Sequence, residues 1–291
     1  MTVDREAINR IAHLELLAKT AVDGFLSGRH RSRFRGASLE FAQHREYVPG
    51  DDLRHLDWKV WARADRLTVK QYEAETNLSA VFAVDASASM DYGEGSANKF
   101  ACAQRMTAAL SYLLTNQSDA VGAIFLKERL ESEVPPRTGR AQFHALTAAL
   151  VGVKPNGKSD PGARLQELAE RGGARGLRVV VSDFYGQPER LTAAISGLRR
   201  RGHDVLALHV LHRDETEFPF DRFSQFEGLE EPARVSCDAA ALREEYRRIV
   251  GAHCDALQRR LAALGVTYRK VLTDQPLSET LAALLLERAR S

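Results

Sequence analysis

The chain has 291 residues, of which 44% are hydrophobic and 27% are charged, a mixture typical of folded globular proteins. Its 41 Lys and Arg nearly balance its 39 Asp and Glu, so the net charge of +2 gives no reason to infer a nucleic-acid-binding or membrane-surface protein. No stretch approaches the ~18 consecutive apolar residues that a membrane span needs, and we expect a soluble protein.

Charge and cysteine patterns refine this expectation. Residues 29–70 hold ten Lys or Arg and six Asp or Glu, so the basic part lies near the N-terminus. The cysteines Cys102, Cys237 and Cys254 have no CxxC or Cys/His metal spacing, which predicts reduced thiols. Residues 1–28 carry charges among isolated apolar positions, unlike a signal peptide. We therefore expect a cytoplasmic location.

The first predicted element is an amphipathic helix. Apolar residues recur every three or four positions from Ile8 to Phe25, and Gly28 follows them. Because this spacing gives the helix one apolar face, we expect it to dock on another part of the protein. A basic arm at residues 29–35 and a turn-rich segment come next, and residues 67–72 alternate like a half-exposed strand.

Beyond residue 77, short apolar runs alternate with amphipathic helical patterns. The runs are too short for helices and too uniformly apolar for strands with one exposed face, which predicts buried parallel strands. The predicted strands lie at 80–84, 121–125, 179–181, 205–208 and 266–272, and the helices at about 99–116, 140–151, 161–171, 188–201, 238–264 and 278–289. This order predicts an α/β fold with a doubly wound, mostly parallel, Rossmann-like sheet.

The same pattern predicts two domains. Residues 1–76 would hold the N-terminal helix, the basic arm and a small strand-and-turn subdomain rich in Arg and Trp. Residues 77–291 would hold the doubly wound domain.

Oxygen-bearing side chains lie where the predicted strands end. Asp85, Ser87 and Ser89 follow the first strand, Ser159 lies in a loop before a helix, and Asp183 follows the strand at 179–181. Because ligands bind at the carboxyl ends of parallel strands, we expect these side chains to converge. Carboxylates and hydroxyls are hard ligands that suit Mg²⁺ or Mn²⁺. The sequence thus predicts a divalent metal site.

Two features have simpler interpretations as well. Ser159 or Asp160 before Pro161 is also a pattern for a helix N-cap with proline at the first helical position. Asp91 and Glu94 are the local candidates for a catalytic base beside a metal, but we expect them to be residues of the site's rim.

The D-x-S-x-S motif, the loop hydroxyl and the later Asp resemble the metal-ion-dependent adhesion site of von Willebrand factor A domains. This resemblance implies that Ser87 and Ser89 ligate the metal directly and that Asp85 and Asp183 hold metal-bound waters. Ser159 stands where that family usually has threonine.

A second resemblance covers nearly the whole chain. The segment REYVPGDDLRHLDW at residues 45–58, AR at 62–63, FE at 226–227 and LTDQPL at 272–277 are similar to the bacterial family called domain of unknown function 58. That family carries a von Willebrand A-like domain and is commonly encoded beside MoxR-type AAA+ ATPases. The resemblance implies an adaptor or chaperone-like partner of such an ATPase.

Charged residues of alternating sign surround the tryptophans of this segment. They form either an internal salt-bridge network or a surface that docks a partner, since exposed Trp and Arg are strong interface anchors. The candidates for partner binding are Arg45, Asp51, Asp52, Arg54, Asp57, Trp58 and Arg63.

We therefore expect a non-enzymatic, Mg²⁺-dependent protein-interaction module that binds an acidic side chain of a MoxR-type AAA+ ATPase or of its client. The alternative is a metal-dependent phosphohydrolase that uses Asp85 and Asp183. A third and more distant hypothesis is nucleic-acid binding through the basic arm at residues 29–35.

Overall fold

The computed structural model describes residues 5–28, 41–46, 68–72 and 78–288, which fall into two compact units. In the smaller unit, His30–Asn77, strand β1 (Phe41–Glu46) pairs antiparallel with β2 (Thr68–Tyr72). Strand β2 confirms the strand predicted at residues 67–72.

The larger unit is built on one six-stranded sheet. Its strands follow the order β10-β7-β6-β3-β4-β5, and all neighbours are parallel except the edge pair β4 and β5. The strands are β3 (Ser79–Asp85), β4 (Ala120–Leu126), β5 (Leu130–Arg137), β6 (Leu177–Ser182), β7 (Asp204–Leu211) and β10 (Thr267–Leu272). The predicted mostly parallel sheet is confirmed. The sequence did not predict β5, where Pro135 and Pro136 are tolerated because the strand lies at the edge.

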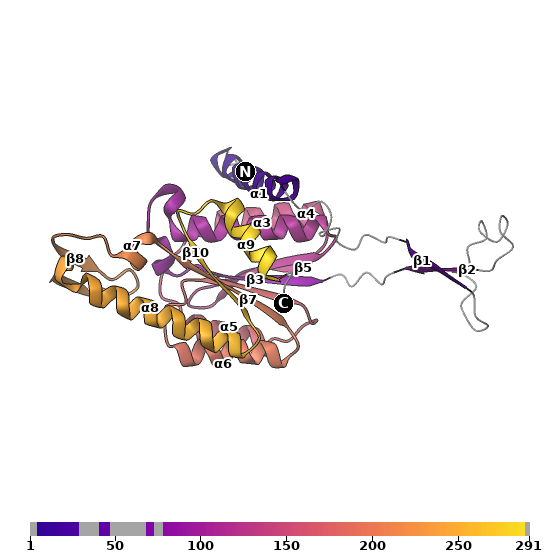
Figure 1. The fold of residues 1–291 in the computed structure, drawn as a ribbon. Coiled ribbons are helices and arrows are strands. Elements are labelled where there is room, and N and C mark those ends of the chain that lie inside the picture. The colour runs from indigo at the N-terminus through magenta and orange to yellow at the C-terminus, as the bar shows by residue number, and fades with distance from the viewer. Residues whose placement is uncertain (1–4, 29–40, 47–67, 73–77, 289–291) are drawn as a thin grey trace. The chain divides into compact units, whose positions relative to one another are not determined.

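Helices cover both faces of this sheet (Figure 1). One face is covered by α3 (Lys99–Asn116), α4 (Arg140–Gly152) and α9 (Leu277–Arg288), with α1 (Arg5–Gly28) outside them, and the other by α5 (Pro161–Glu170), α6 (Pro188–Arg200) and α8 (Ala239–Ala263). Strand β3 serves both layers, since Phe82 and Val84 enter one core and Ala83 the other. Within the described part of the chain, no helix is both long enough and apolar enough to cross a bilayer.

Helix α1 packs on the layer formed by α3, α4 and α9. Leu14, Ala18 and Val22 belong to the same core as the central strands. Arg10 adds a hydrogen bond of 2.7 Å from its guanidinium to the carbonyl of Val151 at the end of α4. The apolar face predicted for this helix therefore packs within the larger unit. The predicted domain boundary had instead placed the helix in the same domain as the residues up to 76.

Short elements between β7 and α8 were not predicted. They are the one-turn helix α7 (Arg213–Glu217) and a hairpin of β8 (Phe223–Glu227) and β9 (Arg234–Asp238). Aromatic rings anchor the hairpin on α8: Phe218 stacks on Tyr246 with ring centroids 4.2 Å apart, and it also packs against Phe220 and Phe226. Because this segment has few strongly periodic apolar residues, its structure depends on these tertiary contacts.

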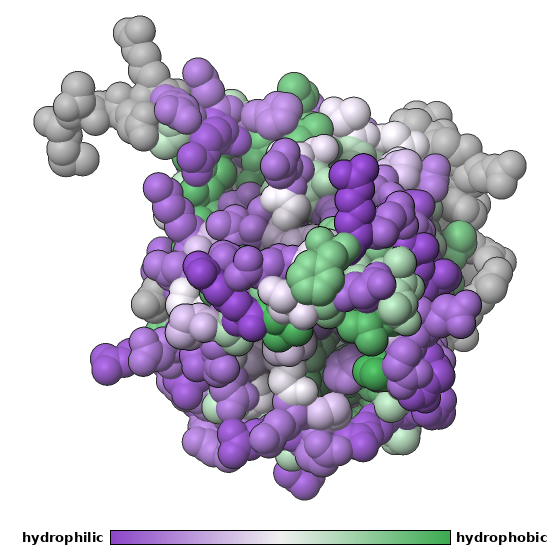
Figure 2. Space-filling model, turned by 90° about the vertical axis from the view of Figure 1, so that its left-hand side faces the viewer, coloured by the Kyte–Doolittle hydropathy of each residue, from purple (hydrophilic) through white to green (hydrophobic). Residues whose placement is uncertain are grey.

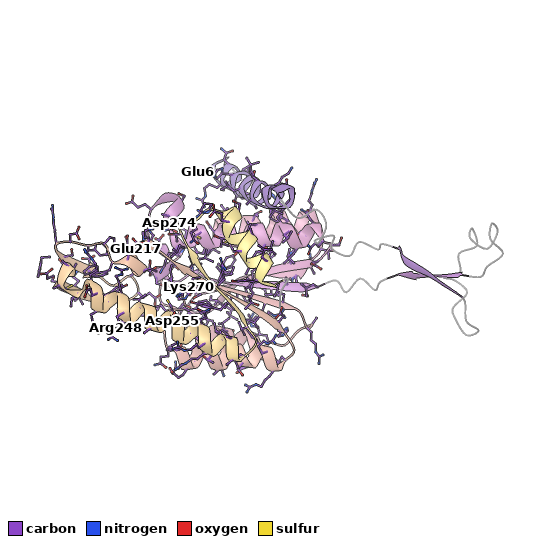
Figure 3. The ribbon with its side chains drawn as sticks, viewed as in Figure 1. Glu6, Glu217, Arg248, Asp255, Lys270 and Asp274 are labelled. Carbon is purple, nitrogen blue, oxygen red and sulfur yellow. The ribbon has the colours of Figure 1, made fainter. Side chains whose placement is uncertain are left out.

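Ion pairs on the surface connect neighbouring elements (Figure 3). Lys270 on β10 lies 3.6 Å from Asp255 on α8, and Arg213 on α7 lies 2.6 Å from Asp274, just beyond β10. Such exposed pairs contribute only about 0–1 kcal/mol each, so the stability of this unit comes mainly from its two apolar cores.

The docking of α1 can be tested with two leucines of the same helix. Leu14 is 6% exposed and Leu16 is 62% exposed. Leu14→Ala should lower the free energy of unfolding by about 2–4 kcal/mol, because it leaves a cavity in the core. Leu16→Ala should change it by less than about 0.5 kcal/mol. Urea unfolding measures both values, and equal small effects would show that α1 is not part of the core.

Candidate functional site

The first part of the site is the turn that follows β3. Asp85 at the end of this strand is fully buried. Its Oδ1 accepts a hydrogen bond of 3.0 Å from the backbone N–H of Ser87, and its Oδ2 accepts one of 2.7 Å from the hydroxyl of Ser182 on β6. The Oγ atoms of Ser87 and Ser89 lie 3.0 Å apart. The D-x-S-x-S motif therefore brings one carboxylate and two hydroxyls together.

The loop before α5 is attached to this turn by backbone hydrogen bonds. The N–H of Asn156 donates to the carbonyl of Ala86 over 3.1 Å, and the N–H of Ala88 donates to the carbonyl of Gly157 over 2.9 Å. Gly157 has a φ of +70°, a conformation that glycine adopts without steric cost. Two residues later, the Oγ of Ser159 is buried and has no hydrogen-bond partner among the described residues.

Asp183, directly after β6, completes the cluster. Its Oδ1 accepts a hydrogen bond from the N–H of Tyr185 over 3.1 Å, and the nearby hydroxyl of Ser89 helps to lower the pKa of its carboxyl group. The ammonium of Lys99, at the start of α3, lies 2.8 Å from Asp183 Oδ2 and 2.8 Å from Glu215 Oε1 on α7. The sequence analysis missed Lys99 and Glu215. A lysine that begins an amphipathic helix ordinarily lies in solvent, and α7 itself was not predicted.

The two aspartates differ in their electrostatics. Burial, followed by the nearby charge of Asp183, raises the pKa of Asp85 to about 7. Burial also tends to raise the pKa of Asp183, but the ion pair and hydrogen bond with Lys99 outweigh this effect and hold it below its ordinary value. The structure thus keeps one carboxylate firmly ionised and leaves the other without a cationic partner.

These residues fit a divalent ion through hydroxyls as well as carboxylates. Among the residues that the structure describes, no three His, Cys, Asp or Glu side chains form a metal-binding group. An ion would therefore depend on the hydroxyl oxygens. The Oγ of Ser159 is buried and has no hydrogen-bond partner among the described residues, so a bound ion would supply the partner that this atom needs. The carboxylates of Asp85 and Asp183 repel each other, and a bound cation would neutralise their negative charge.

The capping interpretation holds for one residue of this loop. Asp160 is the N-cap of α5, where its side chain accepts a hydrogen bond of 3.0 Å from the N–H of Ala163, and Pro161 begins the helix. Ser159 has no such role. Asp91 and Glu94 both have exposed side chains, and Asp91 accepts a hydrogen bond from Asn98.

The carboxyl ends of β3 and β7, and with them Asp85, lie on the side of the larger unit where the β8–β9 hairpin lies (Figure 1), and this side is turned toward the viewer in Figure 2. Apolar side chains gather there among polar ones. Tyr185, two residues after Asp183, is 76% exposed. Lys158 in the loop before α5 forms an ion pair of 2.6 Å with Glu231 in the hairpin turn, so the hairpin borders the site.

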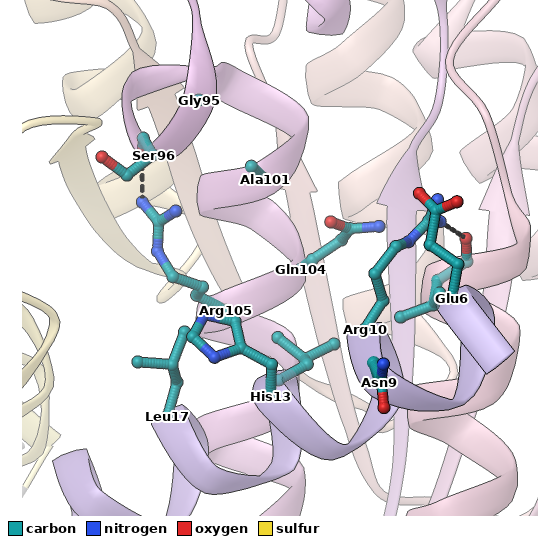
Figure 4. A pocket seen from close by; sticks show the side chains of 12 residues that line it. Glu6, Asn9, Arg10, His13, Leu17, Gly95, Ser96, Ala101, Gln104 and Arg105 are labelled. Carbon is teal, nitrogen blue, oxygen red and sulfur yellow. Dashed lines mark hydrogen bonds between the residues drawn. The ribbon is translucent and has the colours of Figure 1, made fainter.

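A second hollow of about 700 Å³ lies between α1 and α3 (Figure 4). The guanidinium of Arg10 donates to the carbonyl of Val151, and that of Arg105 donates to the carbonyl of Ser96 over 2.7 Å. Because both arginines bind backbone carbonyls, they hold helices and loops in place. This hollow contains none of the residues predicted to bind a metal.

The side chains predicted to bind a partner are not among those that the structure describes. Arg45 lies on β1, of which only the backbone is described. Asp51, Asp52, Arg54, Asp57, Trp58 and Arg63, together with the basic arm at residues 29–35, lie outside the described residues.

The sheet order and the two helical layers define a doubly wound α/β protein of the kind that the sequence predicts. Residues 43–256 match the family described as protein of unknown function DUF58, and the chain belongs to this family. Uncharacterized protein Rv1480 of Mycobacterium tuberculosis is 32% identical over 267 residues, which cover 90% of this chain and 83% of that protein. Uncharacterized protein Mb1516 of Mycobacterium bovis has the same identity and coverage.

Solved structures share the fold at low sequence identity. The crystal structure of an aerotolerance-related membrane protein from Bacteroides fragilis has a TM-score of 0.50 and 18% identity, covering 74% of this chain and 100% of that chain. The SpRpn10 VWA domain has a TM-score of 0.40 and 12% identity, covering 70% of this chain and 94% of that chain. The predicted family and the predicted α/β fold are confirmed.

The raised pKa of Asp85 predicts how stability depends on pH without divalent ions. The pKa of Asp85 is about 7 in the folded protein, whereas its ordinary pKa is 3.8. The protein therefore loses stability as the pH rises between these two values. Asp85→Asn should therefore be more stable than the natural protein at pH 8, by on the order of 2–4 kcal/mol, and the advantage should vanish near pH 4. Urea unfolding in chelator across this range provides the measurement. A constant difference at all pH values would contradict the assignment.

Proposed function

We propose that this chain is a non-enzymatic protein-interaction module whose ligand contact is a Mg²⁺ or Mn²⁺ ion held by Asp85, Ser87, Ser89, Ser159 and Asp183. The observation that carries this proposal is the convergence of three separate segments at the carboxyl ends of β3 and β6, where Asp85, Ser87 and Asp183 are buried. A buried Ser159 hydroxyl with no hydrogen-bond partner in the described structure supports it.

The donor set favours binding over catalysis. Neutral hydroxyls neutralise an ion less than carboxylates do, so a bound cation keeps much of its charge for a ligand from another molecule. A carboxylate of a partner protein is the hard anionic group that suits such an ion. Asp91 and Glu94, the local candidates for a catalytic base, both have exposed side chains.

The proposed partner is a MoxR-type AAA+ ATPase or its client, with the chain acting as an adaptor. Membership of the DUF58 family supports this partner class through the resemblance described above. The exposed Tyr185 and the hairpin bordered by the Lys158–Glu231 pair offer additional contact surface beside the proposed ion.

The ion site can be tested with a double substitution. Ser87→Ala combined with Ser89→Ala removes two proposed direct ligands and should abolish Mn²⁺ binding measured by calorimetry, while the thermal unfolding temperature changes little in chelator. Ser236→Ala, which removes an exposed hydroxyl on β9, serves as the matched control and should bind like the natural protein. Unchanged Mn²⁺ affinity in the double variant would refute the proposed ligands.

The interaction can be tested with an AAA+ ATPase encoded beside this chain. The immobilised natural protein should capture the purified ATPase in Mg²⁺, whereas the Ser87→Ala, Ser89→Ala variant in the same buffer should capture at least about ten-fold less. Comparing variants in one buffer separates the ion of this chain from the Mg²⁺ that the ATPase itself needs. Equal capture by both proteins would move the interface away from the site.

The same preparations test the enzymatic alternative. Turnover of p-nitrophenyl phosphate by the natural protein in Mn²⁺ that is lost in Asp85→Ala would favour a phosphohydrolase. We expect no such turnover.

A further inference from the structure

Basic side chains gather at the amino ends of β6 and β7, the ends opposite to the proposed metal site. The loops that precede these two strands meet here, since the N–H of Asp204 donates to the carbonyl of Gly176 over 3.0 Å. Residues 171–178 and 199–204 together hold six arginines and one acidic residue, Asp204. The two loops therefore bring an excess of positive charge to this end of the sheet.

Acidic side chains compensate only part of this charge. Arg171 forms ion pairs with Glu133 over 3.2 Å and with Glu167 over 2.9 Å. Arg199 forms one with Asp204 over 3.3 Å. In the described part of the chain, the other four arginines of the two loops form no ion pair: Arg175, Arg178, Arg200 and Arg201. An exposed arginine needs no partner, because water solvates it, but a buried one does.

Arg178 is the buried member of this group. Its side chain on β6 is 5% exposed. Its guanidinium donates to the carbonyl of Leu177 over 3.2 Å and to the carbonyl of Ala174 over 3.3 Å, and neither acceptor carries a charge. Burial lowers the pKa of Arg178, and no described carboxylate opposes this effect. A buried cation without an opposite charge is unfavourable, so an anion at this place would stabilise the structure.

His203, directly before β7, is also buried, with 3% of its surface exposed. Its Nδ1 has no hydrogen-bond partner among the described residues. Burial, followed by the positive charges of Arg178 and Arg201, lowers the pKa of His203, so both guanidiniums lie near the ring. Arg175 lies across the preceding residue, where a Cβ on Gly202 would be 2.9 Å from its Nε. The amino-end cluster therefore consists of Arg175, Arg178, Arg201 and His203.

We propose that the amino-end cluster binds an oxyanion of the phosphate type, as the free ion or as a phosphoryl group. A guanidinium presents parallel N–H donors that match the oxygens of such an anion. The anion would give Arg178 the opposite charge that the described chain does not provide. It would also favour a proton on Nδ1 of His203, and this N–H would then donate to an anion oxygen. The proposed ion site lies at the other end of the strands, and this inference does not depend on it.

A basic surface without a defined site leads to a different expectation. Such a surface attracts anions through its total charge, so the loss of any one arginine has a similar effect. A site depends instead on the arginines that face the anion. Arg200 offers the comparison, because it is exposed at the end of α6, directly before Arg201, and carries the same charge.

The test is isothermal titration calorimetry of the full chain with sodium phosphate, in EDTA and at constant ionic strength. EDTA removes divalent ions, so phosphate cannot bind through the proposed metal site. The natural protein should bind a single phosphate. Arg175→Gln and Arg201→Gln should each weaken binding about ten-fold, because a charge-assisted hydrogen bond is lost. Arg200→Gln is the matched control and should change the affinity by less than about two-fold.

Arg178→Met should abolish phosphate binding, because it removes the buried charge. If this variant does not fold, Arg175→Gln and Arg201→Gln still test the site, since they change exposed side chains. Absence of binding by the natural protein, or equal losses in Arg200→Gln and Arg201→Gln, would overturn the inference.

The same titration with O-phosphoserine separates the two sources of the anion. An affinity equal to that for phosphate would support the site and indicate a phosphoryl group carried by a larger ligand. Binding of inorganic phosphate alone would support the site and indicate the free ion.

Discussion

Asp85 and Asp183 lie at the ends of the adjacent parallel strands β3 and β6, and both side chains are buried. The other groups of the site provide hydrogen bonds and charge for these two carboxylates. Burying a carboxylate is unfavourable unless hydrogen bonds or opposite charges compensate, and two of them side by side repel each other. The hydroxyl of Ser182 and the N–H of Ser87 compensate for Asp85, while the ammonium of Lys99 compensates for Asp183. The unequal compensation is what separates their pKa values.

The same groups connect the site with its surroundings. Lys99 and Glu215 attach α7 to Asp183 at the carboxyl end of β6, and α7 leads into Phe218, whose ring stacks on Tyr246 and supports the β8–β9 hairpin. The Lys158–Glu231 pair attaches the hairpin turn to the loop that carries Ser159, one of the proposed metal ligands. A partner that reaches an ion at this edge would therefore also meet the hairpin, which gives the proposed module a surface larger than the ion alone.

The chain belongs to the DUF58 family and has a doubly wound α/β fold, and a fold of this kind does not by itself determine a function. A binding role is favoured by the donor types, which are mainly hydroxyls, and by the exposed positions of Asp91 and Glu94. These features concern chemistry at named atoms and are independent of the likeness in fold.

The sequence by itself determined five of the six strands of the sheet and its long helices, because apolar periodicity is local, and it predicted the five proposed ligands, because the carboxyl ends of parallel strands lie together. It also predicted that the first helix docks through one face. Only the tertiary structure decided that this helix packs with the larger unit, that Pro135 and Pro136 lie in an edge strand, and that Lys99 enters the site. These outcomes depend on contacts between residues far apart in the chain, such as Lys99 with Asp183 and Glu215, and local patterns do not encode such contacts.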